Sequence, residues 1–356
     1  MWAFGAVGTL RKLRLQEEVA IGHDRGVFFG SGRYCRIDSP AESPSASKGI
    51  KPTVYLLDTF HPTAVKHAQS LFDAILPDDS RHAEWREKAE YLLIRSSYLT
   101  ADDVKSAPRL KALGKQGVGI DKIDAAACRE RNIKIFNTPG VNAQAVAETV
   151  LTLTMSVARQ VGRIIALQSA GQTIPKEKCS GLIVSQKTIG IVGMGNIGQK
   201  VAKIFQGGLG CSIIAYDPLL PEDAWADIPH TRAKSLEEVL EISDVVTLHI
   251  PLLPQTRNLI DYTQISRMKR NAILINTARG GIINEADLER ALKEELIFGA
   301  GLDCHEQEPP TQERYGGLWG TGRVVSTPHI GAATAQTQME TAMAAIDRLA
   351  EYIRSQ

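Results

Sequence analysis

Residues 188–198, TIGIVGMGNIG, decide the fold of this chain because they join a predicted strand to a predicted helix through a glycine-rich turn. The apolar run Thr188–Val192 is typical of a buried strand. Gly193 then permits a tight turn, Gly195 lets a ligand approach the backbone, and Gly198 lets the following helix pack closely on the strand. The free N–H groups at the start of that helix favour an anion. This arrangement predicts a site for the pyrophosphate of a dinucleotide.

An acidic residue further along supports this interpretation, because a glycine pattern alone also arises from packing between a strand and a helix. Asp217 stands nineteen residues after Gly198, at the end of the predicted strand Ser212–Tyr216. A carboxylate there accepts hydrogen bonds from the adenosine ribose and repels a 2′-phosphate, which predicts NAD as the cofactor in preference to NADP. The alternative is a turn that Asp217 merely begins, since Pro218 follows it.

Strand-like and helix-like segments alternate on both sides of the glycine turn. The predicted strands lie at residues 54–58, 92–94, 133–136, 188–192, 212–216, 245–248, 272–275 and 324–326. Apolar residues at helical spacing run from Val146 to Val161, and again from Met339 to Ile353 near the end of the chain. This alternation predicts an α/β fold of βαβ units with a mostly parallel sheet. At 356 residues the chain is long enough for two domains.

Composition and charge are those of an ordinary soluble globular protein. Hydrophobic residues make up 43% of the chain and charged residues 23%. The 41 basic residues nearly balance the 40 acidic ones and leave a net charge of +1. This balance argues against nucleic acid or an anionic membrane as a partner bound through a basic surface. We also expect no membrane span, since no apolar stretch approaches the ~18 residues that a span needs.

The first 49 residues differ from the rest and are expected to form a disordered tail or linker outside the fold. They lack sustained periodicity and end in a small, polar, proline-broken run, SPAESPSAS at 39–47. Because no secretory signal is evident, we expect a cytoplasmic protein, while arginines in this tail leave organellar targeting open. Five cysteines with no close pair argue against a disulfide framework and against a Cys-x-x-Cys site, so no bound metal is expected.

Four polar residues in the second half of the chain are candidates for chemistry, since each lies near the end of a predicted strand or apolar run. Arg279 carries a planar fork that suits a carboxylate, and His329 is a natural proton shuttle. Glu308 would raise the pKa of His329 by stabilising the imidazolium if the two are in contact. Asp303 is placed to hold the nicotinamide end of the cofactor. Arg279, His329 and Glu308 each have a structural alternative, namely a surface arginine in a turn, a structural histidine and an exposed acid in a loop.

Several separate motifs together resemble those of the D-isomer-specific 2-hydroxyacid dehydrogenases. These motifs are GVGID at 117–121, NTPGVN at 137–142, INTARG at 275–280, GLD at 301–303, Glu308-Pro309 and TPHIG at 327–331. They follow one another in the family's order, and the resemblance covers residues 50–356. Agreement among several independent motifs is far more specific than any one of them.

The resemblance implies roles for individual residues. Arg279, Glu308 and His329 correspond to the family's catalytic arginine, glutamate and histidine. The implied cofactor-binding residues are Gly193, Gly195, Asn196, Ile197, Gly198, Asp217, His249, Ile250, Pro251, Thr277, Ala278, Arg279, Asp303, His329, Ile330, Gly331 and Ala332. The implied substrate-binding residues are Arg95, Ser96, Val118, Gly119 and Arg279. Among them, the backbone N–H groups near Val118 and Gly119 are expected to hold the substrate carboxylate.

The resemblance also implies an architecture and an activity. A Rossmann NAD-binding domain of residues 147–329 is inserted into a flavodoxin-like substrate domain of residues 50–146 and 330–356, and each domain is a doubly wound parallel sheet. The implied activity is reversible hydride transfer between NAD(H) and C2 of a small 2-oxo or 2-hydroxy acid, in a homodimer. Phosphoglycerate, hydroxypyruvate and glyoxylate are the leading substrates, with a dedicated biosynthetic oxo acid equally open. Arg95 favours a phosphorylated acid, although it also suits pairing with a surface acid.

The sequence departs from the family pattern in the region of the expected site. Cys304-His305 replaces the usual aliphatic and aromatic residues, which alters one wall of the expected site. Glu308 argues against a formate dehydrogenase, because family relatives that act on formate carry glutamine here. Only 27 residues follow His329, so a regulatory C-terminal domain is not expected.

The rival function is an NAD(H)-sensing corepressor of the C-terminal-binding-protein type, which keeps this fold and catalytic trio but docks peptides.

Overall fold

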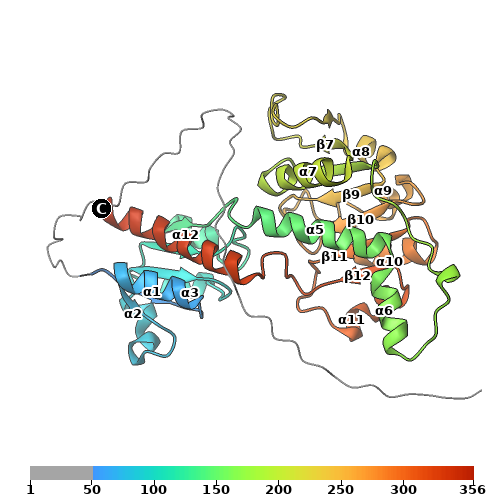
Figure 1. Cartoon of the computed structure of the whole chain (residues 1–356). Coiled ribbons are helices and arrows are strands. Elements are labelled where there is room, and N and C mark those ends of the chain that lie inside the picture. Colours follow the sequence, from blue (N-terminus) through green and yellow to red (C-terminus); the bar gives the residue numbers. More distant parts are fainter. Residues whose placement is uncertain (1–50) are drawn as a thin grey trace, which may run out of the picture. The chain divides into compact units, whose positions relative to one another are not determined.

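The computed structural model describes residues 51–356 and contains two parallel β-sheets, each flanked by helices (Figure 1). The predicted α/β fold with two doubly wound parallel sheets is therefore confirmed. The predicted tail at residues 1–49 lies outside the described residues.

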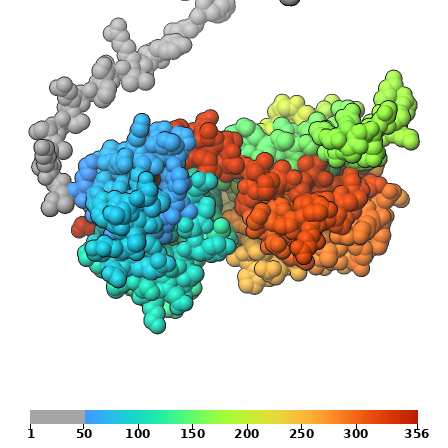
Figure 2. Space-filling view, turned by 90° about the horizontal axis from the view of Figure 1, so that it is seen from below, coloured from blue at the N-terminus to red at the C-terminus, as the bar shows by residue number. Residues whose placement is uncertain are grey.

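The first sheet has five parallel strands in the order β2-β1-β3-β4-β5, which is the flavodoxin-like order. Its strands are β1 (Thr53–Leu56), β2 (Asp73–Ile75), β3 (Tyr91–Ile94), β4 (Ala112–Lys115) and β5 (Lys134–Phe136). The helices of this part are α1 (Pro62–Leu71), α2 (Trp85–Lys88), α3 (Ala101–Ser106), α4 (Ala125–Glu130) and, from the end of the chain, α12 (Ala335–Arg354). Helix α12 packs on α1 and β4, so the last residues of the chain, red in Figure 2, lie against the first described ones, blue.

The second sheet has seven parallel strands in the order β12-β11-β10-β9-β6-β7-β8. Its strands are β6 (Thr188–Val192), β7 (Ser212–Tyr216), β8 (Thr231–Arg232), β9 (Val245–Leu248), β10 (Ile273–Asn276), β11 (Gly299–Leu302) and β12 (Val324–Ser326). Its helices are α5 (Ala143–Ala158), α6 (Val161–Ser169), α7 (Asn196–Leu209), α8 (Leu236–Ile242), α9 (Tyr262–Arg267), α10 (Glu285–Lys293) and α11 (Gln312–Gly320). The strand order reverses between β6 and β9, as in the Rossmann fold, and ligands bind outside the carboxyl ends of strands at such a reversal.

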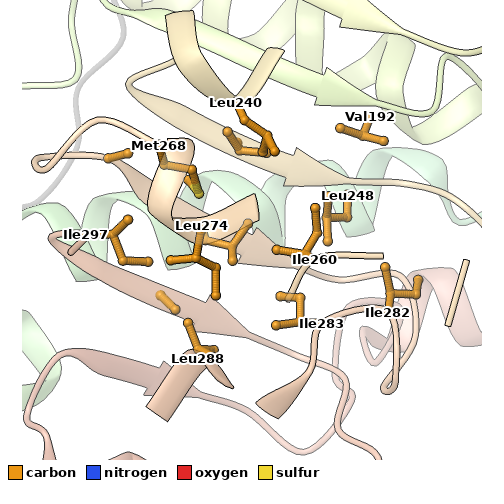
Figure 3. Packing of buried hydrophobic residues seen from close by; sticks show 14 of the residues in the cluster. Val192, Leu240, Leu248, Ile260, Met268, Leu274, Ile282, Ile283, Leu288 and Ile297 are labelled. Carbon is orange, nitrogen blue, oxygen red and sulfur yellow. The ribbon is translucent and has the colours of Figure 1, made fainter. Parts of the chain in front are cut away.

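Fully buried strands hold helices on both faces of the second sheet. All four residues of β9 and of β10 are buried, as a parallel sheet covered on two faces requires. Leu274 of β10 packs on one face with Leu240 of α8 and Leu288 of α10 (Figure 3). The other face packs against α5 and α7, through Leu153 and Val201. The strands are therefore held firmly, and their ends give defined positions to the loops that follow.

The sequence pattern locates every strand that it predicts to within two residues at each end. It does not predict β2, β4, β8 or β11, which are short or rich in small residues. The predicted helical stripe to Val161 is wrong at its end. Helix α5 stops at Ala158, Gln160 adopts a left-handed φ of 54°, and α6 starts at Val161 after a bend of 65°.

Each of the two sheets lies within one of the predicted domains. The first sheet lies within residues 53–136 and the second within residues 188–326. The predicted boundary between residues 146 and 147 falls inside α5, which packs on α7, β10 and β11 of the second part. The exact domain limits stay a prediction.

Among the described residues, no single helix is long and apolar enough to cross a membrane. Helices α5 and α6 reach the required length and composition only as a bent pair.

Candidate active site

The predicted cofactor and catalytic residues lie in loops at the carboxyl ends of the parallel strands. The residues that follow β6, β7, β9, β10, β11 and β12 are Gly193, Asp217, His249, Thr277, Asp303 and Thr327. Because the carboxyl ends of parallel strands share one edge of the sheet, these loops converge.

The glycine loop has the geometry that a dinucleotide requires. Gly193 has a left-handed φ of 97°, and a Cβ here would stand 2.4 Å from the carbonyl oxygen of His249. A Cβ on Gly198 would stand 2.4 Å from the Gly193 oxygen, whereas one on Gly195 would meet nothing within 4 Å. Gly195 thus leaves open space at the start of the 14-residue helix α7, which has no side-chain cap. These residues fit a pyrophosphate at the helix N-terminus.

Asp217 is held beside this loop. Its Oδ2 accepts the backbone N–H of Met194, and its Oδ1 accepts that of Leu219, each at 3.0 Å. The second bond shows that Asp217 also begins a turn, so the two interpretations of this residue coexist. The nearby guanidinium of Arg232 donates to backbone carbonyl oxygens, including that of Asp217 at 2.6 Å. The Asp217 carboxylate therefore keeps lone pairs for a ribose, and Arg232 is already engaged.

Two neighbouring loops carry buried polar atoms that have no partner among the described residues. Burial lowers the pKa of His249 to about 3, so this ring is neutral. Its Nε2 lies 3.0 Å from Thr247 Oγ1, while its Nδ1 is unpaired within residues 51–356. The buried Thr277 hydroxyl is likewise unpaired in this part of the chain. Because unpaired buried polar atoms are costly, both fit a site that a bound cofactor completes.

His329 and Glu308 are in direct contact. The Nδ1 atom of His329 lies 3.1 and 3.0 Å from the two carboxylate oxygens of Glu308. The two side chains are 43% and 37% exposed, so the pair is open to solvent. Because the carboxylate engages Nδ1, Nε2 is the nitrogen available to a substrate oxygen.

The surroundings favour the charged forms of both residues. Contact with the sulfur of Cys304 and with the Glu308 carboxylate raises the pKa of His329 to about 10, against an opposing effect of burial. Burial acts to raise the pKa of Glu308, but the hydrogen bond to His329, the positive charge of that ring and the backbone N–H of His305 together outweigh burial and leave this pKa below its ordinary value. Burial raises the pKa of the Cys304 thiol, so the negative charge beside His329 near neutral pH is that of Glu308.

The carboxylate of Asp303 holds the loop that carries His329. Its Oδ1 accepts the Thr327 hydroxyl at 2.6 Å and the N–H of Ile330 at 2.8 Å, and its Oδ2 accepts the N–H of Gly331 at 2.8 Å. These bonds hold His329 at a left-handed φ of 60°, which a non-glycine residue adopts only where its surroundings enforce it. Asp303 is thus a positioning residue for His329, and its contact with the nicotinamide stays a prediction.

Arg279 stands on a turn that is fixed by a side chain and by close packing. The Oδ1 of Asn276 accepts the N–H of Ala278 at 3.0 Å, and its Nδ2 donates to the carbonyl oxygen of Arg279 at 2.8 Å. A Cβ on Gly280 would stand 1.9 Å from the carbonyl oxygen of His305, so only glycine lets this turn pack on the loop after β11.

The guanidinium of Arg279 lies against the predicted carboxylate-binding loop. Its Nε donates to Asp121 Oδ2 at 3.0 Å, and a Cβ on Gly119 would stand 2.0 Å from its Nη2. Within residues 51–356, the backbone N–H groups of Val118 and Gly119 have no hydrogen-bond acceptor. The structure therefore brings the two predicted contacts to a carboxylate together. Asp121 ends the motif GVGID at 117–121, but the sequence does not indicate its contact with Arg279.

Arg95 and Ser96 lie in the loop after β3, which is held by Asp58. The Oδ2 of Asp58 accepts the backbone N–H of Arg95 at 2.6 Å and that of Ser96 at 3.0 Å. The exposed guanidinium of Arg95 donates from Nη1 to the carbonyl oxygen of Thr59 at 3.1 Å. The role of Arg95 and Ser96 in substrate binding stays a prediction.

A buried lysine at the end of β4 is absent from the sequence prediction. Lys115 is 7% exposed, and its Nζ donates to the carbonyl oxygens of Arg95 at 2.7 Å and of Gln116 at 2.6 Å. An ammonium has three N–H donors, so one has no acceptor among the described residues. Strand β4 reads ALGK, and neither its composition nor its spacing marks the lysine as functional.

The unusual pair Cys304-His305 affects the site unequally. Cys304 is 1% exposed and its sulfur lies beside His329. The ring of His305 turns away, with its Nε2 2.8 Å from Ser326 Oγ. Only the backbone N–H of His305 reaches Glu308, at 3.2 Å. Cys304 is therefore part of the site wall, and the His305 side chain does not compete for Glu308.

Comparison with known proteins identifies the family. Residues 151–331 match the family profile described as D-isomer specific 2-hydroxyacid dehydrogenase, NAD binding domain. The chain is also 38% identical over 263 residues to the hydroxypyruvate reductase of Thermotoga maritima, which covers 74% of this chain and 84% of that protein. The chain belongs to the D-isomer-specific 2-hydroxyacid dehydrogenase family. The predicted oxidoreductase class and an NAD(H)-type cofactor are therefore confirmed.

Two further comparisons agree with membership of this dehydrogenase family. The D-3-phosphoglycerate dehydrogenase of Methanocaldococcus jannaschii is 33% identical over 307 residues, covering 85% of this chain and 58% of that protein. The chain spans about half the length of the phosphoglycerate dehydrogenases that it matches. A solved structure from Thermus thermophilus is 32% identical, with a TM-score of 0.74, and covers 85% of this chain and 97% of the other.

Proposed function

We propose that this family member transfers a hydride reversibly between NAD(H) and C2 of a small 2-oxo or 2-hydroxy acid. The proposal rests on one observation, namely that a carboxylate-binding arginine and a proton-donating histidine lie on neighbouring loops. Arg279 lies against Gly119, and His329 lies 3.0 Å from Glu308 on a neighbouring loop. This reaction requires a group that holds the substrate carboxylate. It also requires a charged histidine that has a carboxylate partner.

In this mechanism Arg279 binds the substrate carboxylate together with the backbone N–H groups of Val118 and Gly119. The planar guanidinium presents parallel N–H donors, so it can hold the carboxylate and polarise the C2 carbonyl at the same time. Asp121 positions the guanidinium by accepting its Nε–H at 3.0 Å. This arrangement fixes C2 relative to the proton donor.

His329 carries the proton. When bound, the nicotinamide cofactor supplies the hydride in reduction and accepts it in oxidation. His329 donates its Nε2 proton to the C2 oxygen as negative charge develops there, and Glu308 stabilises the imidazolium before the transfer. In oxidation a neutral His329 takes the proton from the substrate hydroxyl. Asp303 keeps the ring in position throughout, through the hydrogen bonds that hold its loop.

We infer that the substrate carries a second anionic group, as a phosphorylated oxo acid does. Lys115 supports this inference, because its buried ammonium keeps one N–H that has no acceptor among the described residues. Arg95 adds a second cation on the adjacent loop. Similarity to a D-3-phosphoglycerate dehydrogenase points the same way. Hydroxypyruvate, glyoxylate and a dedicated biosynthetic oxo acid are the alternatives.

A substrate panel tests both parts of the proposal. The full-length protein is incubated with NADH and, in separate reactions, phosphohydroxypyruvate, hydroxypyruvate, glyoxylate, pyruvate and 2-oxo acids with bulkier side chains, and NADH absorbance is followed. Turnover of one acid supports the proposed reaction, and the highest kcat/KM identifies the substrate. If NADH binds and no acid of the panel is reduced, the phosphorylated substrate is contradicted, and a dedicated biosynthetic oxo acid or an NAD(H)-sensing function is left.

The charge on Lys115 predicts a pH dependence that distinguishes phosphorylated from unphosphorylated substrates. Burial lowers the pKa of Lys115 to about 8. The charged groups around it are Asp58, Asp121, Lys122 and Arg279. The ammonium is charged below about pH 8 and neutral above it. We therefore expect the ratio of kcat/KM for phosphohydroxypyruvate to that for hydroxypyruvate to fall by up to about tenfold per pH unit above that value.

This ratio cancels the titration of groups that act on both substrates, His329 included. Lys115→Gln should lower the ratio near pH 7 by at least about tenfold and remove its pH dependence. Lys111→Gln is the matched control, because Lys111 is an exposed lysine next to the same strand and pairs with Glu90 at 2.8 Å. A ratio that stays flat as pH rises past the pKa of Lys115 would rule out its contact with the phosphate.

Asp217→Asn should shift the cofactor preference from NADH toward NADPH. The amide keeps an acceptor for the Met194 N–H but removes the charge that repels a 2′-phosphate. We expect the ratio of kcat/KM for NADH to that for NADPH to fall by at least about tenfold. Asp227→Asn, at an exposed acid that pairs with Lys203 at 3.3 Å, is the control. An unchanged ratio in Asp217→Asn would contradict the proposed NAD preference.

We also infer that the protein is a homodimer. Helix α6 reads VGRIIALQS and buries none of its residues. Its side chains Val161 and Ile165 are exposed, as is Ile183 in the segment that follows. Exposed apolar side chains on a helix favour an interface with another molecule. Light scattering on the full-length protein measures the oligomeric state, and a monomer at assay concentrations would contradict this inference.

A further inference from the structure

Three side chains of different chemical kinds meet beside the proposed proton donor. They are the thiol of Cys304, the carboxylate of Glu308 and the imidazole of His329, and one ligand atom of each lies within 4.8 Å of the other two. The proposed hydride transfer assigns chemical roles to the carboxylate and the imidazole, whereas the thiol takes part in no bond change and only helps to keep His329 charged. The cluster therefore offers chemistry beyond that reaction.

Each member of the cluster is held in place by the fold. The Cys304 side chain is buried directly after β11, with its sulfur 3.5 Å from the carbonyl oxygen of Ala278. His329 lies on the loop that Asp303 holds. Glu308 and His329 are partly exposed, which gives an ion a way in from solvent. The three donors are thus arranged before any ion arrives, and one side of the cluster is open.

The set of donor atoms is selective for a class of cation. Thiolate sulfur, imidazole nitrogen and carboxylate oxygen are the ligands that Zn²⁺ prefers, at roughly 2.0–2.3 Å from the metal. Three protein ligands with a fourth position open are the arrangement of zinc sites that remain accessible to solvent. Mg²⁺ and Ca²⁺ require a shell of oxygen ligands, which one carboxylate does not provide.

We propose that Cys304, Glu308 and His329 bind Zn²⁺ or a similar borderline-soft divalent cation, and that this cation reversibly inhibits the enzyme. As the metal–sulfur bond forms, Cys304 releases its proton to water, and a His329 nitrogen and a Glu308 oxygen complete the protein ligands. Metal binding goes beyond the proposed function and does not depend on it. Inhibition rests on the proposed function, because the metal withdraws His329 from proton transfer.

Direct metal binding is the first test, because it needs no turnover. The full-length protein is treated with a chelator and dialysed against ZnCl₂, and bound zinc is counted. We expect the affinity of wild type to exceed that of Cys304→Ala by at least about tenfold. Cys304→Val, which fills the buried position with an apolar side chain, is the second variant should the alanine variant not fold. Cys179→Ala is the matched control, since Cys179 is a free and partly exposed thiol outside the cluster.

Co²⁺ gives an optical readout of the same site. A thiolate-to-cobalt charge-transfer band should appear in wild type and in Cys179→Ala, and should be absent from both Cys304 variants. Equal zinc affinity in wild type and the Cys304 variants, or no such band in wild type, overturns the metal site.

Inhibition is measured against the metal-free rate of each variant. Zn²⁺ should inhibit wild type and EDTA should restore its rate, whereas Cys304→Ala should need at least about tenfold more Zn²⁺ for the same fractional loss. Mg²⁺ at equal concentration should not inhibit. Zinc bound without loss of rate overturns the inhibitory part. Zinc bound by a protein that reduces no oxo acid supports the metal site and contradicts the proposed function.

Discussion

Replacing His329 by alanine should lower kcat for oxo-acid reduction by about 10²–10⁴-fold, the usual contribution of a positioned acid–base group. His329 is the group that donates a proton to the C2 oxygen in the proposed mechanism. Its contacts with Cys304 and Glu308 raise its pKa to about 10, so it is charged and able to donate at neutral pH. NADH binding, followed by fluorescence, should change far less, because the proposed sites for the pyrophosphate and the ribose are the glycine loop and Asp217, away from His329.

A matched control and a rescue separate proton transfer from structure. His67→Ala removes another close histidine–carboxylate contact, that of His67 with Asp347 at 2.6 Å between α1 and α12, and should leave the rate unchanged. Added imidazole should restore part of the activity of His329→Ala, which a purely structural defect would not allow. A His329→Ala enzyme within about a factor of two of wild type would exclude the proposed role.

The strands that carry the cofactor site could be predicted because they are runs of apolar side chains. Strands β4 and β11 could not, since their sequences, ALGK and GAGL, are mostly small residues. Close packing explains that composition. A Cβ on Gly114 would stand 2.8 Å from the carbonyl oxygen of Ala345, and one on Gly301 would stand 2.9 Å from the Cβ of Leu153. Glycine is required there by neighbours that are far away in the sequence.

Motifs in the sequence name candidate residues but not their partners. Arg279, Glu308 and His329 could be singled out by residue type and by position after a strand. The contact of Arg279 with Asp121 joins residues that are 158 positions apart, and no local sequence pattern predicts it. Asp303 presents a similar case. Its position in the sequence predicts contact with the nicotinamide of the cofactor. In the structure it forms the hydrogen bonds that orient the loop of His329. Long-range contacts of this kind become visible only once the sheets are assembled.

Arg279→Lys should lower kcat/KM for the oxo acid by about 10²–10³-fold, even though it keeps the positive charge. The guanidinium of Arg279 is fixed in three directions. Its Nε donates to Asp121 at 3.0 Å, its Nη1 donates to the carbonyl oxygen of Ala278 at 2.6 Å, and its Nη2 lies against Gly119. A lysine ammonium is a point charge on a flexible stem and cannot reproduce this geometry. The substrate would lose a paired set of donors, and its C2 carbonyl would lose its polarising group.

Two further variants show whether geometry or charge carries this effect. Asp121→Asn keeps an acceptor near Nε but weakens the ion pair, so it should raise KM by a smaller factor than Arg279→Lys. Arg267→Lys is the matched control, because Arg267 pairs with Glu241 at 3.1 Å on the surface. If Arg279→Lys kept kcat/KM within about twofold of wild type, a single positive charge would suffice at this position. Bidentate binding of the substrate carboxylate by Arg279 would then be contradicted. The N–H groups of Val118 and Gly119 would have to orient the carboxylate without it.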